Sequence, residues 1–134
     1  MTKLEFLKGM KKLANYFLKD LSDEELTSWY EIFKDIEVET FYMSIQEIGK
    51  SNKYFPVLSE LYEECRKQRK EFFLSILENN KSIPENRLGY LKSMVDWYSI
   101  QKEYPKEIIK EVRFIELLLP QNALYSYILP VEPH

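Results

Sequence analysis

Large apolar residues recur at intervals of three and four along most of the chain, which is the spacing of an amphipathic α-helix. Six segments show this pattern, at about residues 3–18, 22–33, 37–48, 56–77, 85–104 and 105–119, and short polar breaks separate them. The pattern therefore predicts an all-α protein, a small helical bundle of about five to six helices. After Pro120 the periodicity stops, and three of the six prolines lie in a C-terminal tail that we expect to be non-helical.

Several residues mark where the expected helices begin and end. Ser22 with Glu25, and Ser82 with Glu85, have the spacing of a capping box, in which each pair closes the start of a helix. Gly49 is expected to end the third helix in a left-handed conformation. Pro56 and Pro105 suit the first turns of the fourth and sixth helices.

The main polar break, residues 79–85, predicts a division of the chain. We expect an N-terminal helical bundle over residues 1–80, a C-terminal helical hairpin over 81–119 that is packed on the bundle or loosely attached to it, and the tail over 120–134. At helical spacing, core positions are the default for aromatic residues. Trp29, Phe33 and Trp97 are therefore expected to lie in the core.

Composition narrows the class of protein further. Cys65 is the only cysteine among 134 residues, so no disulfide can form within the chain, and it is expected as a small buried residue. No run of about 18 uncharged apolar residues could span a membrane. The expected location is the cytoplasm of a bacterial host.

Charge is distributed unevenly along the chain. The net charge is −3, but residues 21–48 hold one basic and eight acidic residues, a net charge of −7, whereas residues 1–20 carry +3. An acidic segment repels phosphate backbones, so no specific nucleic-acid binding is expected.

The sequence offers no set of residues for catalysis. Gly49-Lys50-Ser51 resembles the end of a phosphate-binding loop, but Ser44 stands where that loop needs an earlier glycine. The only histidine is His134, which leaves no nucleophile–base pair and no ordinary zinc site. Three glutamates at 60, 63 and 64 are read as a solvated helix face. We therefore expect no enzymatic activity, no metal and no cofactor.

Two segments are candidates for partner binding. The first is a basic run that precedes two phenylalanines, and its alternative interpretation is that it pairs with glutamates one helical turn away. The second is an apolar stretch of the tail, which either enters a partner's groove or folds back over the bundle. The candidate residues are Arg66, Lys67, Arg69, Lys70, Leu124, Tyr125, Tyr127, Ile128 and Leu129.

Three segments resemble the phage replicative-helicase loader/inhibitor family, small proteins of phages that infect low-GC Gram-positive bacteria. The segment Glu24–Asp35 has that family's acidic opening, central tryptophan and closing hydrophobic residue. The segment Lys53–Leu61 is similar to its lysine–aromatic–proline entry into the next helix. The third, Tyr90–Val112 with Trp97 and Pro105, resembles an extension in related phage proteins more loosely.

The resemblance implies an all-helical adaptor without ATPase activity. Such a protein would bind the hexameric replicative helicase, restrain it, and hand it to an origin-bound phage replication initiator. Two other classes remain open: a small helical regulator that sequesters another host or phage protein, and a DNA-binding repressor. The acidic segment argues against the repressor.

Overall fold

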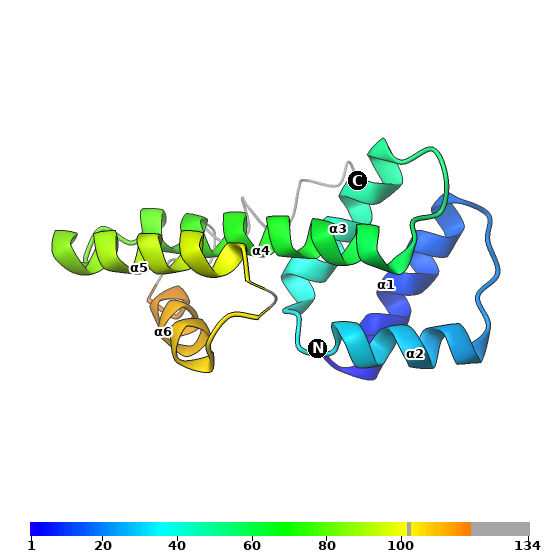
Figure 1. The fold of residues 1–134 in the computed structure, drawn as a ribbon, viewed down its shortest axis with the longest axis horizontal. Helices are drawn as coiled ribbons and strands as arrows, with labels where there is room; N and C mark the ends of the chain where they lie inside the picture. Colours follow the sequence, from blue (N-terminus) through cyan, green and yellow to red (C-terminus); the bar gives the residue numbers. More distant parts are fainter. Residues whose placement is uncertain (102, 119–134) are drawn as a thin grey trace. The chain divides into compact units, whose positions relative to one another are not determined.

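The fold is all-helical, as the hydrophobic periodicity predicts. A computed structural model describes residues 1–101 and 103–118, and these form six α-helices and no strand (Figure 1). The helices are α1 (Lys3–Tyr16), α2 (Asp23–Phe33), α3 (Val38–Ser51), α4 (Leu58–Asn79), α5 (Glu85–Ser99) and α6 (Lys106–Glu116). The predicted tail, 120–134, lies outside the described residues. None of the helices in the described part of the chain is both long and apolar enough to cross a membrane.

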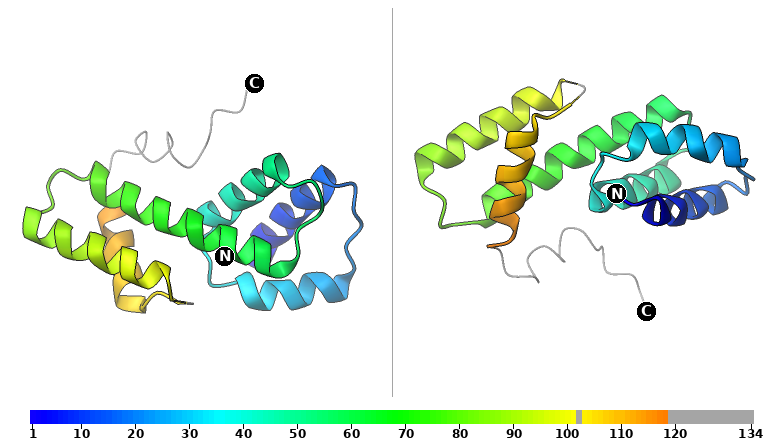
Figure 2. Two further views of the ribbon diagram at one scale, coloured as in Figure 1. Left: turned by 45° about the horizontal axis from the view of Figure 1, so that its top comes forward. Right: turned by 90° about the horizontal axis from the view of Figure 1, so that it is seen from below.

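The helices gather into two compact units. Unit 1 covers Met1–Gln68, and unit 2 begins at Arg69, so the division falls inside α4 (Figure 2). The polar break used to divide the sequence at residue 80 lies beyond α4 instead. Along α4 the buried apolar residues stop at Cys65 and resume at Phe72, and the buried polar residues Gln68 and Arg69 occupy the interval. Each part of α4 therefore contributes to a separate hydrophobic core.

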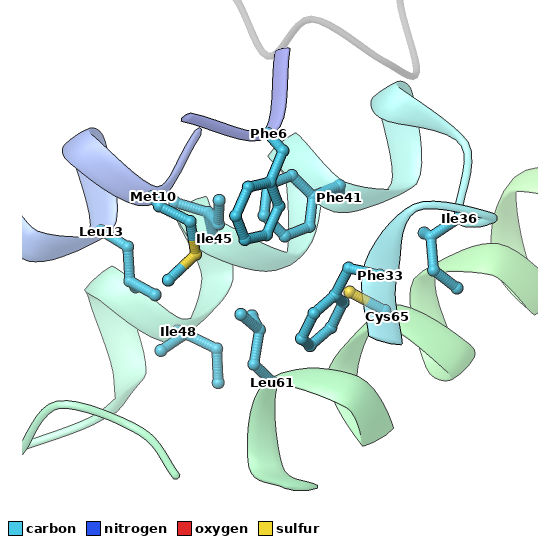
Figure 3. Close-up of a cluster of buried hydrophobic side chains, with 10 residues drawn as sticks. All are labelled: Phe6, Met10, Leu13, Phe33, Ile36, Phe41, Ile45, Ile48, Leu61 and Cys65. Carbon is cyan, nitrogen blue, oxygen red and sulfur yellow. The ribbon is translucent and has the colours of Figure 1, made fainter. Parts of the chain in front are cut away.

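The core of unit 1 is built from α1, α2, α3 and the first turns of α4 (Figure 3). Phe33 is fully buried, as expected, and its ring lies 5.7 Å from that of Phe41 and 5.8 Å from that of Tyr62. Cys65 is also buried, which confirms its reading as a small core residue. The buried members of this core are Phe6, Met10, Leu13, Phe33, Ile36, Phe41, Ile45, Ile48, Leu61 and Cys65.

Helices α1 and α3 run parallel and approach each other closely. Glu5 meets Tyr42, Gly9 lies against Ile45, and Tyr16 lies against Gly49, so the residue numbers rise together along both helices. A Cβ atom at Gly9 would lie 2.5 Å from Cε2 of Phe41, and one at Gly49 would lie 2.5 Å from Cδ2 of Tyr16. Gly49 is thus helical and serves close packing, and its predicted role as a left-handed cap is wrong.

The left-handed cap occurs at the end of α1. Leu18 has φ of 51°, the Lys19 amide donates to the Ala14 carbonyl at 3.0 Å, and the Leu18 amide donates to that of Asn15 at 3.4 Å. These two bonds form a Schellman motif, which usually has glycine at this position. The Leu18 side chain is 95% exposed, so the leucine gains no burial in return.

Unit 2 has a smaller, separate core. It joins the second part of α4 to α5 and α6, and Tyr104 in the connection between α5 and α6 is buried with its ring 5.4 Å from that of Phe73. Trp97 is 55% exposed, so its expected core position is wrong. It lies outside the buried stripe of α5, which is formed by Leu91 and Val95.

Proline rather than serine precedes the helices of unit 2. Pro84 and Pro105 occupy the N-cap positions of α5 and α6, and neither start has a side-chain capping bond. The capping box predicted at Ser82 does not form, because the Ser82 amide and hydroxyl both donate to Oδ1 of Asn80. The box predicted at Ser22 is confirmed. Pro56 lies two residues before α4 begins, not in its first turn as predicted.

Candidate protein-binding surfaces

An apolar and basic surface lies at one end of unit 1, where the end of α1 meets the loop between α3 and α4. Phe55 anchors that loop, because its ring packs edge-on to Phe17 at 5.9 Å and lies 6.0 Å from the ring of Trp29. Since Phe17 and Phe55 point inward, their chain neighbours Leu18 and Tyr54 are left at the surface, 95% and 74% exposed.

Two lysines accompany these exposed residues. The Lys19 ammonium lies 4.5 Å from the centre of the Phe55 ring, and that of Lys53 lies 5.8 Å from the centre of the Tyr54 ring. Such cation–π contacts hold the lysine stems against the aromatic rings. We call Leu18, Lys19, Lys53 and Tyr54 the Leu18–Tyr54 surface.

The acidic residues of α2 have a structural explanation. Ser22 accepts from the Glu25 amide at 3.1 Å, while the Glu25 carboxylate accepts from the Ser22 amide. Asp23 and Glu24 lie in the same first turn, where negative charge is favoured by the helix dipole. At the other end of α2, the Glu31 carboxylate accepts a 3.0 Å bond from Lys34, and this bond raises the pKa of Lys34.

The start of α1 repeats the capping arrangement. Glu5 accepts from the Thr2 amide at 2.8 Å, and Thr2 accepts from the Glu5 amide at 3.1 Å. The bond from the Thr2 backbone holds the pKa of the Glu5 carboxyl below its ordinary value. Tyr42 donates to the Glu5 carbonyl at 2.9 Å, and partial burial, with the nearby charge of Glu5, raises the pKa of its phenol.

The basic run on α4 is divided between different environments. Arg66 pairs with Glu63 at 3.1 Å, and Lys70 pairs with Asp96 at 3.2 Å. Arg69 is buried, with its guanidinium 5.0 Å from the centre of the Tyr104 ring. Lys67 is exposed. Gln68 donates to Glu64 at 3.0 Å, so most of the run serves helix packing and pairing, and Lys67 is left at the surface.

The tail residues proposed for partner binding cannot be placed with these. Leu124, Tyr125, Tyr127, Ile128 and Leu129 lie outside the described residues. Among the residues that are described, no three His, Cys, Asp or Glu side chains come together in a way that could hold a metal ion. The features of unit 1 are those of a small helical protein whose exposed apolar and basic side chains face outward to a partner.

Comparison with known protein families identifies the N-terminal part of the chain. Residues 1–62, just under half of the 134, match the family model for the N-terminal domain of the phage gene 39 protein. That phage protein is a helicase-loader/inhibitor protein. No curated protein and no solved structure matches the chain.

The match confirms the resemblance seen in the first two sequence segments, because Glu24–Asp35 and Lys53–Leu61 both fall inside it. The third segment, Tyr90–Val112, lies beyond it and stays a prediction. The matched residues include all of α1, α2 and α3 and the beginning of α4. They also include the whole Leu18–Tyr54 surface.

Sequence reasoning missed this surface. Tyr54 appears in the second segment only as part of a lysine–aromatic–proline pattern, and Leu18 appears only as the end of the first helix. The alternation of inward Phe17 and Phe55 with outward Leu18 and Tyr54 depends on tertiary contacts between distant parts of the chain. The one local signal is the long side chain directly before Lys19 and Asp20, where the first helix is expected to stop.

Proposed function

We propose that the protein binds a hexameric replicative helicase and restrains or loads it through protein–protein contacts, with no catalysis of its own. The observation that carries this proposal is the match of residues 1–62 to the N-terminal domain of a phage helicase-loader/inhibitor protein. A phage replication initiator, which would receive the helicase, is the second proposed partner. The proposed place of action is the bacterial cytoplasm.

The Leu18–Tyr54 surface is the contact that we assign to the matched part. A leucine in the left-handed region costs roughly 1–2 kcal/mol relative to the right-handed helix. An exposed leucine at that position gains nothing inside the folded protein, and uncompensated local costs of this kind are concentrated at functional sites. With Lys19 and Lys53 beside it, the surface suits a partner patch that has apolar and acidic residues.

The test compares helicase binding by variants that keep the fold. Leu18→Gly removes the side chain and relieves the backbone cost, and Tyr54→Ser removes the exposed ring. The double variant should weaken binding to purified helicase by about tenfold or more, the size expected for interface anchors. Ile32→Ser is the matched control, because Ile32 is a half-exposed aliphatic residue on α2 of the same unit.

The possible outcomes separate the parts of the proposal. No binding by the wild-type protein would remove the helicase as partner, and recovery of a different protein from a host lysate would then favour the sequestering regulator. Unchanged binding by the double variant would keep the helicase but remove the Leu18–Tyr54 surface. ATP turnover that Lys50→Ala abolishes would contradict the absence of catalysis.

The tail is proposed as a second contact. Burying its large side chains in a partner's groove is worth roughly 1.5–3 kcal/mol each before ordering costs. A chain ending at Gln121 should therefore bind the helicase measurably more weakly than the full chain at equal melting temperature. A lower melting temperature for the shortened chain would show that the tail covers the folded core instead.

A further inference from the structure

Helix α6 carries two apolar stripes, and the core of unit 2 uses one of them. Ile108, Val112 and Ile115 are buried. Phe114 and the two residues after the helix, Leu117 and Leu118, are 61%, 80% and 58% exposed. Positions three and four apart share one side of a helix or helical turn, so these three exposed residues form a second stripe, which we call the α6 stripe.

The chain that continues from Leu118 has the composition to cover this stripe. Between Leu117 and Val131 the sequence holds no Lys, Arg, Asp or Glu, and five of the six residues from Leu124 to Leu129 are large and apolar. We propose that the segment Leu124–Leu129 of the same chain docks on the α6 stripe. The assigned contact is apolar on both sides and needs no charged partner.

The intervening residues are long enough for the segment to return. The five residues 119–123 can span about 17 Å when extended. Phe114 and Leu118 are four positions apart, which is about 6 Å along a helix axis. Pro120 also disfavours a straight continuation of the helix, since it lacks an amide hydrogen and clashes with the preceding turn.

Linkage favours the same chain over a second copy. A segment tethered by a short linker is present at an effective concentration in the millimolar range, far above the concentration of protein in a dilute sample. Docking within one chain should therefore not depend on protein concentration. It also rests on the α6 stripe alone, so it stands apart from the helicase proposal.

The consequence for a partner does rest on the proposed function. If the helicase takes the same segment, the docked tail is withheld from it. The apparent dissociation constant then equals the intrinsic one divided by the fraction of tails that are free. The α6 stripe would in that case lower the affinity for the helicase until the partner displaces it.

Amide hydrogen exchange of the full chain tests the docking directly. Exchange of residues 124–129 should be slower by about tenfold or more than in a free peptide of residues 119–134, because a docked segment is protected until it opens. Phe114→Ser/Leu117→Ser should bring exchange to the free-peptide rate. The matched control is Glu107→Ser/Lys110→Ser, which changes two exposed polar residues of α6 and should leave the protection intact.

Each result decides for or against the docking. Free-peptide exchange in the wild-type chain, or protection that survives Phe114→Ser/Leu117→Ser, would overturn it. Protection that appears only at high protein concentration would assign the stripe to a second copy instead.

Helicase titration of the same variants separates the two proposals. With nine tails in ten docked, Phe114→Ser/Leu117→Ser should bind about tenfold more tightly than wild type. Unchanged affinity with lost protection would support the docking and count against the tail's part in the proposed function. Weaker binding by this variant would show that the stripe contacts the helicase directly, and would overturn its assignment to the tail.

Discussion

Units 1 and 2 begin their helices in different ways. In unit 1, α1 and α2 each start with a complete capping box, Thr2 with Glu5 and Ser22 with Glu25. In unit 2, α5 and α6 each follow a proline, Pro84 or Pro105, with extended ψ angles of 142° and no side-chain cap. Unit 1 therefore stabilises its helix starts with hydrogen bonds, whereas unit 2 restricts the backbone before each helix.

The difference shows where stability is encoded. A capping box is written in four consecutive residues, so the helices of unit 1 are supported locally before any tertiary contact forms. Proline restricts the unfolded chain but leaves the first amides of the helix to water. The helices of unit 2 depend correspondingly more on the shared core of α4, α5 and α6.

The two tryptophans give the largest expected contrast between the units. Trp29 lies 6.1 Å from the Phe33 ring and 6.0 Å from the Phe55 ring, at the edge of the unit 1 core, whereas Trp97 is mostly exposed. Trp29→Ala should lower the free energy of unfolding by about 3 kcal/mol, as for a largely buried aromatic residue. Trp97→Ala should change it by less than about 0.5 kcal/mol.

Urea unfolding of both variants, followed by circular dichroism, measures this contrast. Equal stabilities for the two variants would mean that Trp29 does not hold the core. A stable Trp29→Ala protein that no longer binds its partner would turn α2 into an interface.

Two helical glycines should respond to alanine in opposite directions. A Cβ at Gly9 meets the buried Phe41 ring, whereas nothing lies within 4 Å of one at Gly89 in α5. Overpacking outweighs the gain in helix propensity at the first site, so Gly9→Ala should destabilise unit 1 by about 1–2 kcal/mol. Gly89→Ala should stabilise its helix by about 0.5–1 kcal/mol. Thermal melts that shift the same way for both would contradict the close α1–α3 contact.

Serine substitutions test the capping difference itself. Ser22→Ala removes a side chain that accepts from the Glu25 amide, and should cost about 1 kcal/mol. Ser82→Ala removes only a bond to Asn80, outside any helix start, and should cost less than about 0.5 kcal/mol. The measurement is the difference in urea midpoint between each variant and the wild-type chain. A larger loss from Ser82→Ala would restore the predicted box at α5.

Helix number and most core residues could be predicted from sequence because they depend on periodicity. Phe33, Cys65, Leu91 and Val95 are buried as the apolar spacing indicates. The Gly49 cap was wrong because glycine has two uses, and only tertiary packing against Tyr16 decides between them. The division inside α4 had a local signal, since the apolar stripe breaks at the basic run between Cys65 and Phe72.

The candidate surfaces were less predictable. Arg69 looks like a surface cation in sequence, but the Phe73 and Tyr104 rings bury it, and Tyr104 lies 35 positions further along the chain. The exposure of Leu18 follows from a left-handed φ angle that composition does not reveal. The α6 stripe shares the spacing of the buried stripe, so periodicity alone cannot separate the face that packs from the face that does not.

The smallest expected effect is the acid sensitivity of the α1 capping box. The pKa of Glu5 is lowered in the folded chain, chiefly by the bond from the Thr2 amide, so the ionised carboxylate binds better than the protonated one. Its contribution is therefore complete above the pKa of an unfolded glutamate, about 4.3, and is lost as the pH falls through the lower folded value. Glu5→Gln keeps a capping side chain that does not ionise.

The stability difference between wild type and Glu5→Gln should thus narrow as the pH falls from 7 toward 3. Other carboxylates titrate in both proteins, so their effects cancel in the difference. Because Glu5 is at the surface, added salt should weaken the effect at pH 7. A difference that is constant across this pH range would show that the box acts through hydrogen-bond geometry alone. That result would bring the helix starts of unit 1 closer to those of unit 2, where proline carries no titrating group.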